Sequence, residues 1–160
     1  MRIMDIFCRM TLPAIFLRAS DKGEILTYGD GNVSLVLASG DATGGAFSVV
    51  EHRLRPGASG PPLHRHERLC DSFYVLEGTV TLRIGERTVS AGPGSYACFP
   101  PGVAHCYRND TDAPVRMLNI NAPGGWDRVL RALVSAGGDR PLDQTEIGRI
   151  SAEHDMIVLE

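Results

Sequence analysis

Four residues of types that bind transition metals stand in two short stretches of the chain. His64 and His66 lie two residues apart, Asp71 follows them, and His105 stands in a distant stretch. Residues two apart on an extended segment face the same side, so the first two imidazoles can approach one ion together. Imidazole suits Zn, Cu, Fe and Ni, and a carboxylate adds a hard anionic ligand. We expect these residues to share one metal ion with open coordination positions, which is the arrangement that catalysis requires.

Residues with special backbone properties accompany these candidate ligands. Gly78 permits a tight turn between strands, where a side chain would be strained. The run Pro100-Pro101-Gly102 predicts a rigid bend before His105, and the side-chain amide of Asn109 can fix the end of the strand that follows. The remaining histidines, His52 and His154, show no partner spacing and are expected at ordinary surface or edge positions.

Short β-branched or aromatic runs, separated by turn residues, fill the middle of the chain. Val80, Leu82 and Ile84 alternate with polar residues, which is typical of a half-buried strand. Many short strands at this spacing favour an antiparallel sandwich or barrel. The expected strands cover residues 33–38, 46–54, 73–76, 80–84, 87–90, 95–99, 103–108 and 115–121.

The hydrophobic period changes from that of strands to that of helices after residue 125. Apolar side chains from Trp126 to Val134 recur at helical spacing, and Gly137-Gly138 ends the run. A second helix is predicted over about 143–153, and residues 156–159 favour a returning edge strand. We expect Trp126 to anchor the first helix to the core rather than to contact a substrate.

Composition excludes several classes of partner. A chain of 160 residues is expected to form one domain. The net charge of −3 gives no basic surface for nucleic acid or an anionic membrane. No apolar run reaches the length of a membrane span. Residues 1–17 contain a short apolar run that Asp5 and Pro13 interrupt, so a cytosolic N-terminus is favoured over a signal peptide.

The four cysteines form no Cys-x-x-Cys pair and no disulfide framework, so reduced thiols in the cytoplasm are expected. Cys70 and Cys106 each stand beside a candidate metal ligand. Neighbours on a strand point to opposite faces, so both thiols should face away from the metal. The cysteines are Cys8, Cys70, Cys98 and Cys106.

The combined pattern resembles that of single-domain bacterial cupins, in particular those similar to quercetin dioxygenases. The second cupin motif is matched in full by Gly94, Pro100, Gly102, His105 and Asn109. The first motif, which has two histidines, a Glu and a closing Gly, is matched by His64, His66 and Gly78, with Asp71 at the position of the Glu. The leading glycine is offset, with Gly57 near the usual interval. Residues 43–47 and 123–126 and the two-helix tail extend the similarity over nearly the whole chain after residue 20.

This resemblance implies an all-β fold, a cupin jelly-roll β-barrel with two short C-terminal helices. The barrel is expected over residues 21–122, after an N-terminal arm of residues 1–20 and before a helical tail of residues 123–160 that packs on the barrel. The family also implies a homodimer.

Asp71 is the main departure from the family pattern, because its side chain is shorter than Glu by roughly 1.5 Å. Three arrangements are compatible with it. Asp71 binds the metal directly if the strand or the ion is displaced, or it accepts a hydrogen bond from a metal-bound water, or the three histidines hold the metal alone.

The resemblance favours a metal-dependent dioxygenase-like oxidoreductase that acts on a small aromatic or enol/diketone-like substrate. Asp71 would be ligand and general base, with Tyr107 as a second catalytic candidate. Phe73, Val75 and Tyr107 share the strand phase of the ligands and are expected to line the substrate pocket, or else to pack in the barrel core. The cofactor is one divalent ion, with Fe, Mn, Ni, Co and Zn not distinguished. The alternatives are a non-redox metal cupin, either an isomerase or a polyketide-type cyclase, and a ligand-binding cupin without turnover.

Overall fold

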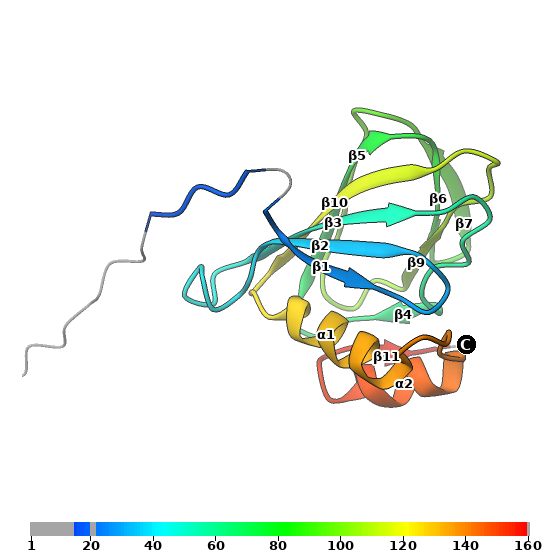
Figure 1. Ribbon diagram of the computed structural model, residues 1–160. Coiled ribbons are helices and arrows are strands. Elements are labelled where there is room, and N and C mark those ends of the chain that lie inside the picture. The colour runs from blue at the N-terminus through cyan, green and yellow to red at the C-terminus, as the bar shows by residue number, and fades with distance from the viewer. Residues whose placement is uncertain (1–14, 20–21, 160) are drawn as a thin grey trace, which may run out of the picture.

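Two antiparallel sheets face one another and enclose the core of the molecule (Figure 1). The computed structural model describes residues 15–19 and 22–159. The first sheet contains, in spatial order, β1 (Glu24–Thr27), β2 (Val33–Ala38), β3 (Ser48–Leu54), β10 (Val115–Ala122), β5 (Cys70–Glu77) and β8 (Tyr96–Phe99). The second contains β11 (Ile157–Val158), β4 (His64–Arg65), β9 (His105–Arg108), β6 (Val80–Ile84) and β7 (Arg87–Ala91).

This arrangement confirms the expected all-β jelly-roll fold with two C-terminal helices. The helices are α1 (Trp126–Gly137) and α2 (Gln144–Ala152), and they lie together below the barrel in Figure 1. Every strand predicted from alternation is present to within a few residues. The short strands β1 and β4 were not predicted as strands, although the segment of β4 was expected to be extended.

The main core lies between the sheets and is filled by the inward-facing residues of five strands. Alternation is clear in β5, where Asp71, Phe73 and Val75 are buried and Tyr74 is exposed. Burial of apolar side chains of this size stabilises the fold by about 1.5–3 kcal/mol each. The cluster consists of Leu54, Ala58, Phe73, Val75, Val80, Leu82, Phe99, Val115 and Met117.

A second apolar cluster joins α1 to strands β1, β2 and β3. Trp126, Val129 and Leu130 of α1 pack with Leu26, Val36 and Val50. Trp126 is 8% exposed, which confirms its expected role as an anchor for the helix. Strand β11 pairs with β4 through Val158 and His64, so the tail is tied to the sheet that carries a candidate metal ligand.

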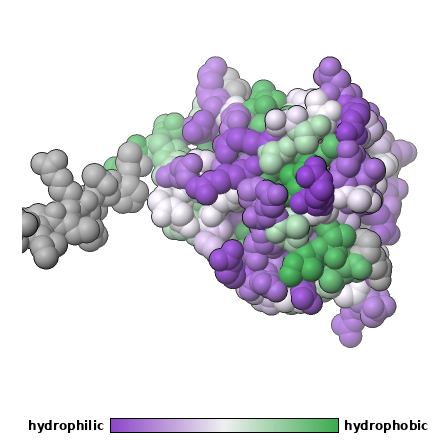
Figure 2. Space-filling model, turned by 90° about the horizontal axis from the view of Figure 1, so that it is seen from below, coloured by the Kyte–Doolittle hydropathy of each residue, from purple (hydrophilic) through white to green (hydrophobic). Residues whose placement is uncertain are grey.

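The face that carries the helices is mostly hydrophilic, with hydrophobic atoms gathered in small separate areas (Figure 2). Within residues 15–19 and 22–159, no helix has the length and apolar character needed to cross a bilayer. The predicted N-terminal arm lies largely outside the described residues, as does Cys8.

Candidate metal centre

The four residues predicted to bind metal come together inside the barrel. One potential ligand atom from each of His64, His66, Asp71 and His105 lies within 4.8 Å of the others. All four side chains are buried, with exposed fractions of 1–3%. His64 of β4 and His105 of β9 are direct partners in the sheet register, so residues far apart in sequence are brought opposite one another.

Backbone carbonyl groups fix the orientation of all three imidazoles. Each Nδ1–H donates to a carbonyl oxygen, which leaves Nε2 as the lone-pair atom of the neutral ring. The pairs are His64 with Pro62 at 2.8 Å, His66 with Asp155 at 2.7 Å and His105 with Val103 at 2.9 Å.

The three Nε2 atoms converge, and none of them carries a hydrogen. Those of His64 and His66 are buried and have no hydrogen-bond partner among the described residues. His105 Nε2 lies 3.1 Å from Asp71 Oδ2, and His66 Nε2 lies 3.8 Å from the same oxygen. Two acceptors at such distances repel unless a cation or a proton lies between them, and buried acceptors without partners are costly. The donor set therefore fits a divalent metal ion, which this cluster could bind.

Two amide groups orient the Asp71 carboxylate. Asn119 and Asn121 donate from Nδ2 to Asp71 Oδ1 at 2.5 and 2.7 Å. These bonds occupy one carboxylate oxygen and leave Oδ2 toward the histidines. Although Asp is shorter than Glu, this oxygen reaches the imidazole cluster. The sequence analysis did not identify Asn119 and Asn121, yet both continue the inward phase of Val115 and Met117 along β10.

Burial keeps His64 and His66 in the neutral form that can bind a metal. Desolvation, followed by the neighbouring His105, lowers the pKa of His64 to about 3. Desolvation also lowers the pKa of His66, although the Asp71 carboxylate opposes it. At neutral pH both rings thus present Nε2 lone pairs.

Several local contacts hold the ligand segments in place. The predicted bend before His105 is present: Gly102 has φ of 86°, and its N–H donates to the His66 carbonyl at 2.7 Å. Asn109 donates to the carbonyls of Arg55 and Ala113, which fixes the end of β9 as expected. Phe99 stacks flat on His105, with ring centroids 4.4 Å apart.

Asp155 links the tail to the loop after β4. Its carboxylate accepts hydrogen bonds from the backbone N–H groups of Glu67, Arg68 and Leu69, while its carbonyl accepts from His66. Burial opposes ionisation of Asp155, but these three donors outweigh it and lower the pKa. The contacts place the C-terminal segment in direct support of a candidate ligand.

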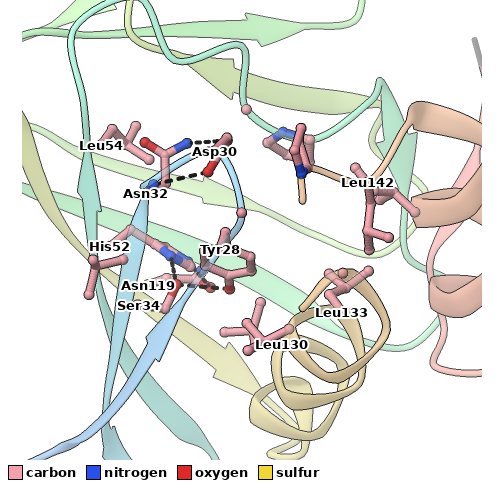
Figure 3. Close-up of a pocket in the computed structure, with 18 of the residues that line it drawn as sticks. Tyr28, Asp30, Asn32, Ser34, His52, Leu54, Asn119, Leu130, Leu133 and Leu142 are labelled. Carbon is pink, nitrogen blue, oxygen red and sulfur yellow. Dashed lines mark hydrogen bonds between the residues drawn. The ribbon is translucent and has the colours of Figure 1, made fainter. Parts of the chain in front are cut away.

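A cavity reaches the cluster between the first sheet and the tail (Figure 3). Phe73 and Tyr107, predicted as pocket residues, line it together with His64 and Asp71. Val75 lies elsewhere, along a second cavity with Leu82 and Phe99. The opposite wall comes from the tail, where Trp126, Leu130, Leu133 and Leu142 line the space. Trp126 therefore borders the cavity as well as the core. The helical pattern predicted an apolar face but not what that face encloses.

A hydrogen-bonded chain follows one wall of this cavity toward Asp71 (Figure 3). Tyr28 lies 3.0 Å from Ser34 Oγ, and Ser34 Oγ lies 2.8 Å from His52 Nδ1. His52 Nε2 lies 3.4 Å from Asn119 Oδ1. Because the Asn119 amide donates to Asp71, its oxygen accepts from His52, so every donor in the chain points toward the carboxylate.

The expectation for His52 was wrong, because this residue is 4% exposed and lines the cavity. Desolvation lowers the pKa of His52, although the hydrogen bond with Asn119 and the negative charge of Asp71 both act to raise it. The missed signal was its phase: His52 lies two residues from both Val50 and Leu54 along β3, and so shares the inward phase of these buried residues. His154 lies partly exposed in the tail, as predicted.

Comparisons with known proteins agree with this architecture. A family model described as a cupin domain matches residues 50–121. Quercetin 2,3-dioxygenase of Bacillus subtilis (strain 168) is 28% identical over 120 residues, which are 74% of this chain and 34% of that protein. The chain thus spans about a third of the length of the curated relatives it matches.

Solved structures give the same result. A structure from Silicibacter pomeroyi, described as a sugar phosphate isomerase from a cupin superfamily, is 31% identical with a TM-score of 0.59, covering 66% of this chain and 74% of that one. The polyketide cyclase RemF of Streptomyces resistomycificus is 22% identical with a TM-score of 0.60, covering 68% and 80%, and this likeness concerns the fold alone. The sequence motifs, the barrel and these matches together show that the chain belongs to the cupin family.

Proposed function

We propose that this protein is a metal-dependent oxygenase that acts on a small aromatic or enol/diketone-type substrate. The observation that carries the proposal is the cavity that joins an apolar space to the candidate metal centre, with His64 and Asp71 in its lining. A substrate held there would present its oxygen atoms to the ion. Similarity to a quercetin 2,3-dioxygenase supports the same reaction class.

The lining of the cavity favours a neutral, partly aromatic substrate. Phe73, Tyr107 and Trp126 offer aromatic surfaces, and leucines of the tail add apolar area. Among the lining residues, Asp30 and Asp71 are acidic and Arg140 is the one arginine. Arg140 is paired with Glu146 at 2.5 Å. A phosphate group would thus meet two acids and a neutralised arginine, which disfavours a sugar phosphate.

The protein groups around the metal have separate roles in this proposal. His64, His66, His105 and Asp71 would hold the ion, which when bound supplies Lewis acidity and, for a redox-active metal, O₂ chemistry. Asp71 lines the cavity, and its Oδ2, which lies 3.1 Å from His105 Nε2, would accept the acidic proton of an enol or phenol. Desolvation by burial raises the pKa of Tyr107 well above its usual value, so its phenol keeps its proton and serves as a hydrogen-bond donor.

Oxygen consumption tests the proposal. Protein loaded separately with Fe, Mn, Co, Ni and Zn would be incubated with flavonols and with a panel of 1,3-diketones in an oxygen electrode. We expect uptake with at least one redox-active metal and none with zinc. Asp71→Asn, which keeps the size of the side chain, should abolish uptake, whereas Cys106→Ser should not. Absence of uptake from every loaded form would contradict the proposal.

A non-redox metal enzyme is the second candidate, either an isomerase or a polyketide-type cyclase. The 31% identity to a protein described as a sugar phosphate isomerase supports the isomerase form. Zinc-loaded protein would then convert an enolisable substrate under anaerobic conditions, where an oxygenase is inactive. A protein that binds such compounds but converts none in either atmosphere would instead be a ligand-binding cupin without turnover.

A further inference from the structure

Two cysteines lie side by side on the outer surface of the barrel. Cys70 begins β5 and Cys98 lies in β8, and their sulfur atoms are 3.3 Å apart. The register pairs Ser72 with Cys98, so Cys70 and Cys98 form a diagonal pair across the two strands. Both point outward, because the residues that follow them, Asp71 and Phe99, are buried inside.

Reagents in solvent can reach this pair. Cys98 is exposed and Cys70 is partly exposed. A hydrogen bond from Ser72, and to a lesser extent one from Cys70, lowers the pKa of Cys98, which increases its thiolate fraction. Cys106 is a natural comparison, since it is partly exposed but lies on β9 in the other sheet.

Each cysteine is one peptide bond from a residue that shapes the candidate metal centre. Cys70 precedes Asp71, whose carboxylate lies 3.1 Å from His105 Nε2. Cys98 precedes Phe99, whose ring stacks on His105 with an interplanar angle of 3°. The sulfur pair is therefore one residue away from two side chains that contact His105.

We propose that Cys70 and Cys98 are a peroxide-sensitive dithiol pair that closes to a disulfide and weakens metal binding at the adjacent centre. Closure shortens the sulfur–sulfur distance from 3.3 Å to about 2.05 Å. The start of β5 and the middle of β8 must approach one another to allow this. Asp71 moves with Cys70, and Phe99 moves with Cys98.

The chemistry balances with a peroxide as the two-electron oxidant. The Cys98 thiolate attacks the peroxide, the O–O bond breaks, and Cys98 becomes a sulfenic acid while hydroxide leaves and takes up a proton. The Cys70 sulfur then attacks the Cys98 sulfur, the S–S bond forms, the S–O bond breaks, and water departs with the thiol proton. A thiol reductant returns both residues to thiols.

Peptide mapping tests the disulfide. A Cys8→Ser, Cys106→Ser background removes the other thiols and serves as the parent protein. After treatment with hydrogen peroxide, mass spectrometry without reductant should show a Cys70–Cys98 cross-linked peptide that dithiothreitol removes. In Cys70→Ser, Cys98 should stop at a sulfenic acid that dimedone traps, and Cys98→Ser should form neither product. Separate sulfinic acids without a cross-link in the parent would overturn the proposal.

Metal titration tests the effect on the centre. Oxidised parent protein should bind Co²⁺ about tenfold more weakly than reduced parent protein, as expected when the support of a ligand is disturbed. In the Cys70→Ser variant, peroxide treatment in the presence of dimedone, which traps the Cys98 sulfenic acid, should leave the Co²⁺ affinity unchanged within twofold. Equal affinity of the oxidised and reduced parent would refute the coupling. Neither measurement requires an oxygenase substrate, so failure of the dithiol proposal can be distinguished from failure of the proposed oxygenase function.

Discussion

Replacing Asn121 with alanine should weaken metal binding without unfolding the protein. Asn121 is fully buried and donates to Asp71 Oδ1 at 2.7 Å. A hydrogen bond to a charged group contributes about 1.5–3 kcal/mol. Loss of such support for a ligand typically lowers metal affinity about 10- to 100-fold, or roughly 1.4–2.7 kcal/mol. The Asn119 donor remains in the variant, so the carboxylate keeps one of its two restraints.

The assay is a competition titration of metal-free protein with Zn²⁺ and a chromophoric chelator. Ser48→Ala is the matched control, because Ser48 contacts Asn121 at 3.5 Å but makes no bond to Asp71 in the described structure. We expect the control to bind within twofold of wild type and Asn121→Ala to bind at least tenfold more weakly. A folded Asn121→Ala protein with wild-type affinity would refute the role assigned to these amides.

Three further outcomes follow from the structure. His52→Phe leaves the buried Ser34 hydroxyl without its acceptor, so urea denaturation should show a loss of about 1–3 kcal/mol, and an unchanged midpoint would contradict the chain. A Cβ on Gly29 would lie 2.0 Å from the Arg140 backbone, so Gly29→Ala should lower Tm by several degrees, whereas Gly92→Ala, in open space, should not. Burial lowers the pKa of His64 to about 3. The metal-free protein should therefore lose stability as the pH falls below about 6.5, because the imidazole of the unfolded chain takes up its proton before that of the folded protein. A free energy of unfolding that stays constant from pH 7 to pH 4 would contradict this.

The parts of the fold that the sequence predicts are those encoded by local periodicity. Alternation along β5 and β6 identified the strands and placed Asp71 inward. Strands β1 and β4 were missed because a strand of two residues, or one with a single buried residue, has no period to detect. Their pairing depends on partners elsewhere in the chain.

The same distinction applies to the candidate site. Spacing and motif identified the four cluster residues. His64, His66 and Asp71 are close in sequence, and His105 follows a recognisable run of turn residues. His52 was misjudged because its partners Ser34 and Asn119 come from other strands, 18 and 67 residues away. The register between strands, which the sequence alone does not reveal, decides those contacts. The tail was expected to pack on the barrel, but its apolar face also forms the wall of the cavity.

X-ray absorption by protein loaded with one equivalent of zinc tests the central claim most directly. The convergent Nε2 atoms predict three imidazole nitrogens at about 2.0–2.1 Å together with at least one oxygen. His64→Ala should remove one imidazole from this shell, and Asp71→Ala shows whether the carboxylate supplies the oxygen. A spectrum with sulfur ligands, or with fewer than three imidazoles in the wild-type protein, would contradict the account.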